Sequence, residues 1–249
     1  MPVSLLTIRY SFLWQRPVRR LVHPIDLLTM KSEKEYWEKT KSLLGNESLT
    51  LGPYNTYQLR KTPRRFFITL AYYKFAAKIL QRKSKILELG CSEGLGATIA
   101  GEFADKYTGV DLDENAVKWA KQNFESDRCM FIVDNFNGKS YGKFDGLLSL
   151  DVIEHIIPEN DSLFWETVCQ NLTDDGVAVI GTPNEPSQVH ASKVTKSGHI
   201  NLYDHERFWH CGQKYFSNVF LFSANDETIH TGFYPMAHYL IAVCVSPKR

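Results

Sequence analysis

Residues 85–96, KILELGCSEGLG, run from a short apolar strand into a turn that contains three glycines. Gly90 and Gly94 let the backbone turn tightly and approach a ligand, and Glu88 supplies a hydrogen-bond acceptor. A dinucleotide-binding turn has the spacing G-x-G-x-x-G, whereas Ser92 stands two positions after Gly90. The turn therefore favours a nucleoside with a positively charged arm over a pyrophosphate.

An alternation of strands and helices continues beyond this turn. Helical patterns separate the strands, which indicates a parallel sheet with helices on both faces. The last two strands are joined by a loop without a helix, so the final strand is expected to be antiparallel. We therefore predict a seven-stranded, doubly wound, mostly parallel α/β sheet. Its later strands are expected at 107–113, 129–135, 144–151, 176–184, 218–226 and 236–246.

A helical N-terminal extension, residues 1–62, is expected to precede a domain spanning 63–249. It contains a predicted helix at 31–44 and a loop at 45–55. Residues 64–82 read either as a core-facing helix or as a helix that contacts a membrane or a lipid-like acceptor. Residues 1–30 are rich in arginine and read as a targeting or membrane-surface segment, as an irregular extension, or as sequence upstream of a start at Met30.

Acidic residues end the second and third predicted strands. Asp111 is placed for a bidentate hydrogen bond to the two hydroxyls of a ribose. Asp134 and Asn135, at the end of the next strand, are placed to meet an adenine amino group. A single acid at a strand end is often a helix cap, but acids on successive strands favour a nucleoside site.

The chain resembles the class I S-adenosylmethionine-dependent methyltransferases over residues 80–248. The resemblance rests on ILELGCSEG, GVDLDENAV, FIVDN, FDGLLSLDVIEHI and AVIGTPN, with Ser92 standing where that family usually has glycine. It implies S-adenosylmethionine as cofactor. The implied cofactor-binding residues are Glu88, Gly90, Cys91, Gly94, Asp111, Leu112, Asp134, Asn135, Leu150 and Asp151.

Two carboxylates and an imidazole, Asp151, Glu154 and His155, follow the fourth strand, at a spacing that places them on one face of a helix. The segment is similar to that of two subgroups, the ubiquinone-biosynthesis O-methyltransferases and the small-RNA 2′-O-methyltransferases, which bind a divalent metal there. That resemblance adds His199 as a fourth ligand for Mg, Mn, Fe or Zn, and Asp151 departs from it because the subgroups have glutamate. The alternative is a metal-free site in which His155 or His199 is a general base and Glu154 shapes the helix start.

The bulk composition excludes some partners. A net charge of +1 gives no reason to expect nucleic acid, and five widely spaced cysteines read as reduced thiols of a cytoplasmic protein.

The expected function is O-methylation of a sugar, a glycan-assembly intermediate or another small polyhydroxylated metabolite. Alternatives are a quinone-precursor phenol or catechol as acceptor, a nicotinamide-dependent oxidoreductase, and a non-catalytic partner that only binds the cofactor.

Overall fold

The computed structural model describes residues 32–46 and 48–249, and it divides into two compact units, residues 1–48 and 49–249. The described part of the first unit contains helix α1 (Glu33–Leu44). Ser32 caps this helix by accepting a hydrogen bond from the backbone N–H of Glu35, which confirms a helix at the expected place. The predictions made for residues 1–30 lie outside the described residues.

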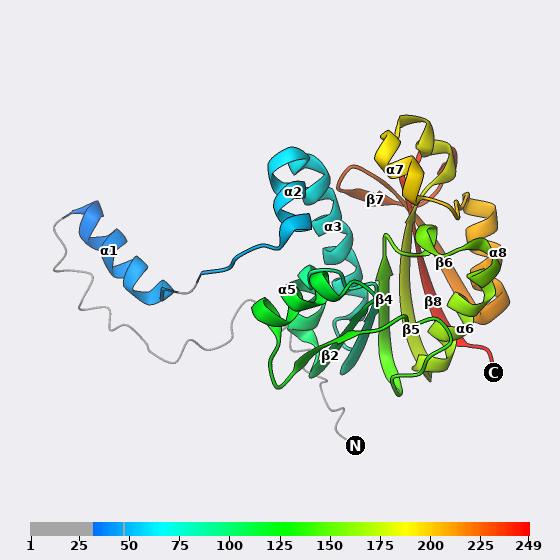
Figure 1. The fold of residues 1–249 in the computed structure, drawn as a ribbon, viewed down its shortest axis with the longest axis horizontal. Helices are drawn as coiled ribbons and strands as arrows, with labels where there is room; N and C mark the ends of the chain where they lie inside the picture. Colours follow the sequence, from blue (N-terminus) through cyan, green and yellow to red (C-terminus); the bar gives the residue numbers. More distant parts are fainter. Residues whose placement is uncertain (1–31, 47) are drawn as a thin grey trace, which may run out of the picture. The chain divides into compact units, whose positions relative to one another are not determined.

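The second unit is built on one sheet whose strand order is β3-β2-β1-β4-β5-β8-β6-β7 (Figure 1). Strands β1 to β5 are parallel neighbours, and β8 is antiparallel to both β5 and β6. The mostly parallel doubly wound sheet and its antiparallel last strand are therefore confirmed. The strands are β1 (Lys85–Leu89), β2 (Lys106–Asp111), β3 (Cys129–Val133), β4 (Phe144–Leu150), β5 (Leu172–Pro183), β6 (Phe216–Asn225), β7 (Thr228–His230) and β8 (Tyr239–Pro247).

The described sheet has eight strands where the sequence pattern predicts seven. The additional strand, β7, spans three residues and pairs with the end of β6, Asn225 lying opposite Thr228. Asp226 has a φ of 49°, which allows the tight turn between the two strands. A three-residue strand is too short to show an alternation, and this is why the segment reads as a loop in the sequence.

Helices cover both faces of the sheet, α3 and α5 on one side and α6 and α8 on the other (Figure 1). The central strand β4 is buried on both faces, so its consecutive residues Leu147 and Leu148 belong to different cores. The helices are α2 (Pro53–Lys61), α3 (Pro63–Leu80), α4 (Leu95–Ile99), α5 (Glu114–Phe124), α6 (Asp161–Asn171), α7 (Lys193–Gly198) and α8 (His205–Tyr215). Short 3-10 turns are η2 (Gly101–Phe103), η3 (Ile153–His155), η4 (Pro158–Asn160), η5 (Glu185–His190) and η6 (Tyr234–Met236).

Three segments differ from the predicted elements. The loop predicted for 45–55 ends early, because α2 begins at Pro53, a residue whose fixed φ suits the first position of a helix. The connection over 183–204, which the sequence predicts as a long polar loop, contains η5 and α7. Glu154 and His155 lie on the 3-10 turn η3 rather than on an α-helix, and Asp151 precedes that turn.

Helix α3 turns the apolar residues of its second half into the core, with Tyr72, Tyr73, Ala76, Ala77 and Leu80 buried. The core-facing interpretation of residues 64–82 is therefore confirmed for this half. The second unit begins at Leu49, so α2, which the sequence analysis assigns to the extension, belongs to the same compact unit as the sheet.

None of the described helices combines the length and the apolarity that a crossing of the bilayer requires.

Candidate active site

A cavity of about 550 Å³ lies at the carboxyl ends of β1, β2 and β4. Helices α2 and α3 form its other wall. In doubly wound sheets this edge is where ligands bind, because the strand order reverses there and the loops diverge. The glycine-rich turn, Asp111 and the segment after β4 all contribute to the lining.

The backbone of the glycine-rich turn has the conformation that its glycines allow. Gly90 has a φ of 81°, and a Cβ there would lie 2.2 Å from Cγ2 of Val152. Gly94 has a φ of 80°, and a Cβ there would meet Ala120 of α5 at 2.8 Å. Gly90 also lines the cavity, and Gly94 does not. The missing Cβ of Gly94 allows the turn and the close packing of α4 on α5.

Asp111 lies at the cavity wall and is held by two backbone donors. Its Oδ2 accepts a hydrogen bond of 2.7 Å from Ser92 N–H, and its Oδ1 accepts one of 2.9 Å from Asp113 N–H. A carboxylate has about four lone-pair sites, so each oxygen keeps one for a hydroxyl group. This arrangement fits a vicinal diol such as that of a ribose.

Of the predicted residues after β2 and β3, some line the cavity and one does not. Leu112, which is 70% exposed, and Asn135 line the cavity. Asp134 does not line it, because its carboxylate forms an ion pair with Lys139 and accepts a hydrogen bond from the Tyr141 hydroxyl. These two interactions lower the pKa of Asp134. Of the predicted pair, Asn135 therefore lines the cavity and Asp134 does not.

Glu88 lies beneath the turn and is fully buried. One of its oxygens accepts a hydrogen bond of 2.8 Å from the Tyr73 hydroxyl, and Oε2 has no partner among the described residues. Burial raises the pKa of Glu88 to about 8, against the opposing effect of the Tyr73 hydrogen bond. A Cβ on Gly96 would lie 2.5 Å from Glu88 Oε2, so this carboxyl packs directly under α4.

Cys91, Leu150 and Asp151 line the cavity as the sequence suggests. The thiol of Cys91 is buried, and burial raises its pKa. Asp151 has a φ of 56°, and its N–H lies 3.1 Å from the Tyr239 hydroxyl oxygen. Removal from bulk water raises the pKa of Asp151, and the charges of Arg65 and His155 oppose that shift.

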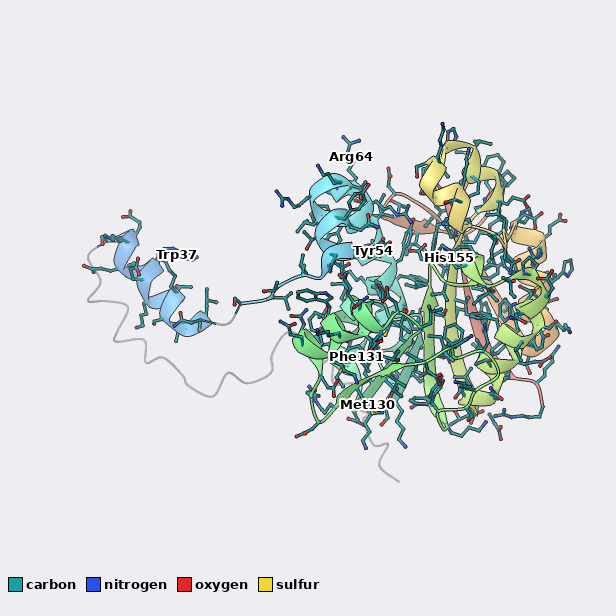
Figure 2. The ribbon with its side chains drawn as sticks, viewed as in Figure 1. Trp37, Tyr54, Arg64, Met130, Phe131 and His155 are labelled. Atoms are coloured by element: carbon teal, nitrogen blue, oxygen red, sulfur yellow. The ribbon has the colours of Figure 1, made fainter. Side chains whose placement is uncertain are left out.

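Glu154, His155 and His199 come together at the end of β4. One ligand atom from each lies within 4.8 Å of the other two, whereas Asp151 is not part of this group. His155, which is labelled in Figure 2, also lines the cavity. His199 lies far along the chain from Glu154 and His155, but it directly follows α7, which places it beside them. The centres of the two imidazole rings are 5.1 Å apart.

The hydrogen bonds of this cluster leave one potential metal-ligating atom on each of its three residues. The Nδ1 atom of His155 donates to the Gly198 carbonyl at 2.8 Å, and that of His199 lies 3.2 Å from Oε1 of Gln188. Each imidazole therefore keeps a lone pair on Nε2. The Glu154 Oε2 atom accepts from the Thr182 hydroxyl at 3.0 Å, and Oε1 has no partner among the described residues.

The electrostatics of the cluster suit a bound cation. Burial, followed by the charge of Asp151, raises the pKa of Glu154 to about 8, and burial lowers the pKa of His199 to about 4. The lowered pKa keeps His199 in the neutral form that ligates a metal, and a divalent metal would stabilise the ionised form of Glu154. Two imidazoles and one carboxylate form a donor set that fits Mn, Fe or Zn.

Helix α2 was not predicted from the sequence, and its side chains line the cavity together with those of α3. Tyr54, Asn55 and Gln58 line it from α2, and Phe66, Thr69 and Tyr73 line it from α3. The Gly-Pro pair at 52–53, which is typical of a helix start, was the available signal for α2. Glu93, in the glycine-rich turn, also lies in the wall and is 3% exposed.

Comparison with known proteins shows the family. Residues 59–226 match the family model described as a methyltransferase domain. A ubiquinone biosynthesis O-methyltransferase of Arabidopsis thaliana is 26% identical over 125 residues, which cover 47% of this chain and 37% of that protein. A cyclopropane-fatty-acyl-phospholipid synthase of Escherichia coli K12 is 24% identical over 63% of this chain and 43% of its own length. The chain thus spans less than half the length of these two relatives.

Solved structures share the fold. The N-methyltransferase NodS from Bradyrhizobium japonicum, in complex with S-adenosyl-L-homocysteine, superimposes with a TM-score of 0.58 at 14% identity, over 85% of this chain and 98% of its own. The methyltransferase domain of the bacterial protein CtHen1 gives a TM-score of 0.58 at 16% identity, over 72% and 99% of the two chains. The chain belongs to the class I S-adenosylmethionine-dependent methyltransferases, and its cofactor is S-adenosylmethionine.

Proposed function

We propose that the protein transfers the methyl group of S-adenosylmethionine to the hydroxyl of a phenol or catechol that carries an apolar tail, such as a quinone precursor. The observation that carries the proposal is the position of the Glu154–His155–His199 cluster. His155 belongs both to this cluster and to the wall of the cofactor cavity, next to Leu150 and Asp151. Groups that remove or hold a proton therefore lie beside the place where the methyl donor is expected.

The protein mainly has to align the acceptor with the methyl donor and deprotonate its hydroxyl, because the methyl carbon of a sulfonium is already activated. The acceptor hydroxyl loses its proton as its oxygen attacks the methyl carbon, and S-adenosylhomocysteine leaves with the electron pair of the broken carbon–sulfur bond. Asp111 would hold the ribose hydroxyls, and Gly90 would allow the methionine arm to pass close to the backbone. Nε2 of His155 or His199 would receive the acceptor proton.

A divalent metal fits the same cluster. Glu154, His155 and His199 would hold it, and the bound ion would lower the pKa of a coordinated acceptor hydroxyl. Without the ion, His155 is the better placed base, since it reaches the cavity and His199 does not line it. Activity with and without a chelator separates these two cases.

The lining of the cavity supports an aromatic acceptor. Apolar side chains reach it from α3 and from the segments after β3 and β4, namely Phe66, Phe136, Leu150, Val152, Ile156 and Ile157. Among the relatives, one is named for ubiquinone biosynthesis, one is a cyclopropane-fatty-acyl-phospholipid synthase, and one is a sphingolipid C9-methyltransferase of Candida albicans. These names favour an acceptor with a lipid-like part.

A sugar or glycan-intermediate hydroxyl, which the sequence analysis prefers, is the second candidate. The carboxamides of Asn55, Gln58 and Asn160 line the cavity and would hydrogen-bond a polyhydroxylated acceptor. The same cluster would act on a sugar as on a catechol, because both present neighbouring hydroxyls.

We also propose that the turn between α2 and α3 contacts an anionic membrane surface. Tyr57, Leu59 and Phe67 are between 40% and 59% exposed there. Arg60 and Arg64 flank them, and residues 49–87 contain no acid. Figure 2 shows Arg64 at the end of the helix pair, pointing away from the sheet. Aromatic and basic side chains side by side suit a lipid headgroup layer and would bring the cavity to a lipid-tailed acceptor.

The test is a methyl-transfer assay with isotope-labelled S-adenosylmethionine. A dihydroxybenzoate with and without a prenyl tail is compared with a nucleotide-linked sugar, each with and without EDTA. Label in the prenylated phenol supports the first proposal, and label in the sugar alone replaces it with the second. His155→Ala and His199→Ala should each reduce turnover while leaving cofactor affinity intact. Cofactor binding without transfer to any acceptor, in extracts as well, would favour a non-catalytic role.

A further inference from the structure

Helix α2 begins without a cap of its own. Gly52 occupies the N-cap position and has no side chain to accept a hydrogen bond, and Pro53, the first helical residue, has no N–H. The next two backbone N–H groups, of Tyr54 and Asn55, both donate to the carboxylate of Glu93, at 2.7 and 2.9 Å. A residue nearly forty positions along the chain therefore caps this helix.

The fit between the two segments is tight. A Cβ on Gly52 would lie 2.3 Å from the Glu93 carboxyl carbon, so the carboxylate occupies the space that any other residue at position 52 would fill. The negative charge also lies at the positive end of the helix dipole. Glu93 is 3% exposed, so water competes little for these two N–H groups.

Glu93 belongs to the glycine-rich turn, between Ser92 and Gly94. The N–H of Ser92 donates to Asp111, the residue that fits the ribose hydroxyls. The Glu93 cap, by which we mean its carboxylate with the N–H groups of Tyr54 and Asn55, thus joins the cofactor-binding turn to α2. Tyr54 lies at the end of α2 nearer the sheet (Figure 2).

The face of α2 that lines the cavity is ordered by a chain of side-chain hydrogen bonds. Gln58 Nε2 donates to the Tyr54 hydroxyl at 2.9 Å, and the Thr62 hydroxyl donates to Gln58 Oε1 at 2.5 Å. Asn55 and Gln58 are each 8% exposed, although both are polar. This preorganised polar wall faces the turn across the cavity.

We propose that Glu93 is a positioning residue that fixes α2 over the glycine-rich turn, so that the cofactor is enclosed between them. The inference rests on the cofactor of the proposed function and not on its acceptor. Because the Glu93 carboxylate is engaged by the helix, its effect on cofactor affinity passes through α2. Loss of the cap leaves the turn intact but lets α2 detach from it. Only the molecules in which α2 remains docked on the turn then bind the cofactor tightly.

The experiment measures two quantities on the full chain, S-adenosylhomocysteine affinity by calorimetry and amide hydrogen exchange of residues 53–61. In Glu93→Ala the exchange of α2 should rise while that of α3 stays unchanged. If α2 remains docked in about one molecule in ten, the affinity falls about tenfold. Glu93→Gln keeps one acceptor oxygen and should fall between Ala and the native residue. Glu102→Gln, an exposed glutamate beyond α4, is the matched control and should change neither quantity.

Gly52→Ala provides the second variant. Its φ of −66° suits alanine, so the added Cβ acts only by displacing the Glu93 carboxylate. It should raise exchange in α2 and weaken binding although no residue of the turn is substituted, and it decides the matter if Glu93→Ala does not fold. Native affinity or native α2 exchange in a folded Gly52→Ala or Glu93→Ala protein overturns the proposal. Failure of the native protein to bind S-adenosylhomocysteine would instead overturn the cofactor assignment, and the exchange data would still test the cap.

Discussion

Glu88→Gln tests whether the carboxyl beneath the glycine-rich turn is protonated in the folded protein. Glu88 is fully buried with a single hydrogen-bond partner, Tyr73, and its pKa is raised from 4.5 to about 8. In the unfolded chain the same carboxyl ionises near its ordinary pKa. Between these two values the folded state holds a proton that the unfolded state has released. Stability contributed by this group is therefore complete below the unfolded pKa and is lost as the pH rises toward 8.

The magnitude follows from the two pKa values. Each pH unit between them changes the free energy of unfolding by about 1.4 kcal/mol, which amounts to about 3 kcal/mol between about pH 5 and about pH 7.5. Glutamine has no proton to exchange, and its carbonyl oxygen can still accept the Tyr73 hydroxyl hydrogen bond. Its amide nitrogen takes the place of the unpartnered Oε2, at a cost of about 1–3 kcal/mol that does not depend on pH.

Urea unfolding of both proteins without cofactor, at several pH values between about 5 and 8, measures the difference. The stability of Glu88→Gln relative to the native protein should rise by about 3 kcal/mol over that range. Both proteins contain the other groups that titrate in this range, such as Glu154, so the contributions of those groups cancel in the difference between the two stabilities. Glu102→Gln, an exposed control, should show no such trend. Parallel stability curves for the native protein and Glu88→Gln would refute a protonated Glu88.

Three further predictions concern binding. Asp111→Ala should weaken S-adenosylhomocysteine binding by about 100-fold, equivalent to about 2.7 kcal/mol, and unchanged calorimetric affinity would contradict the ribose assignment. His199→Ala should lower the affinity for Mn²⁺ or Zn²⁺ in a metal titration, and equal affinity in both proteins would favour the metal-free site. Charge reversal at both Arg60 and Arg64 should reduce flotation with phosphatidylglycerol vesicles about tenfold or more, whereas reversal at the exposed Arg128 should not, and equal losses would indicate non-specific charge attraction.

Much of the fold could be predicted because its signals are local. Short apolar runs that alternate with helical patterns indicate a parallel sheet, and the glycine spacing identifies the turn at the ligand edge. Elements without a strong local signal were missed. The β7 strand has three residues, and α2 has no side-chain cap within its own segment, since Glu93 supplies it.

The candidate site was predicted in part for the same reason. Asp111 ends β2 and Asp151 directly follows β4, so their place at the edge of the sheet comes with the strand pattern. Asp134 follows a strand as well, but Lys139 and Tyr141 engage its carboxylate in a contact that no spacing rule anticipates. Asp151 was expected among the metal ligands, and the structure instead groups Glu154 with the two histidines.

The sequence by itself determined the doubly wound sheet, the glycine-rich turn and the acidic residues at the strand ends. These depend on backbone conformation and on the period of apolar residues, which neighbouring residues set. Only the tertiary structure decided which side chains meet across the chain. It placed His199 beside Glu154, buried Glu88 under α4, and set Glu93 against the start of α2. Such contacts join residues tens of positions apart, and burial and the exclusion of water, which exist only in the packed molecule, give them their strength and shift their pKa values.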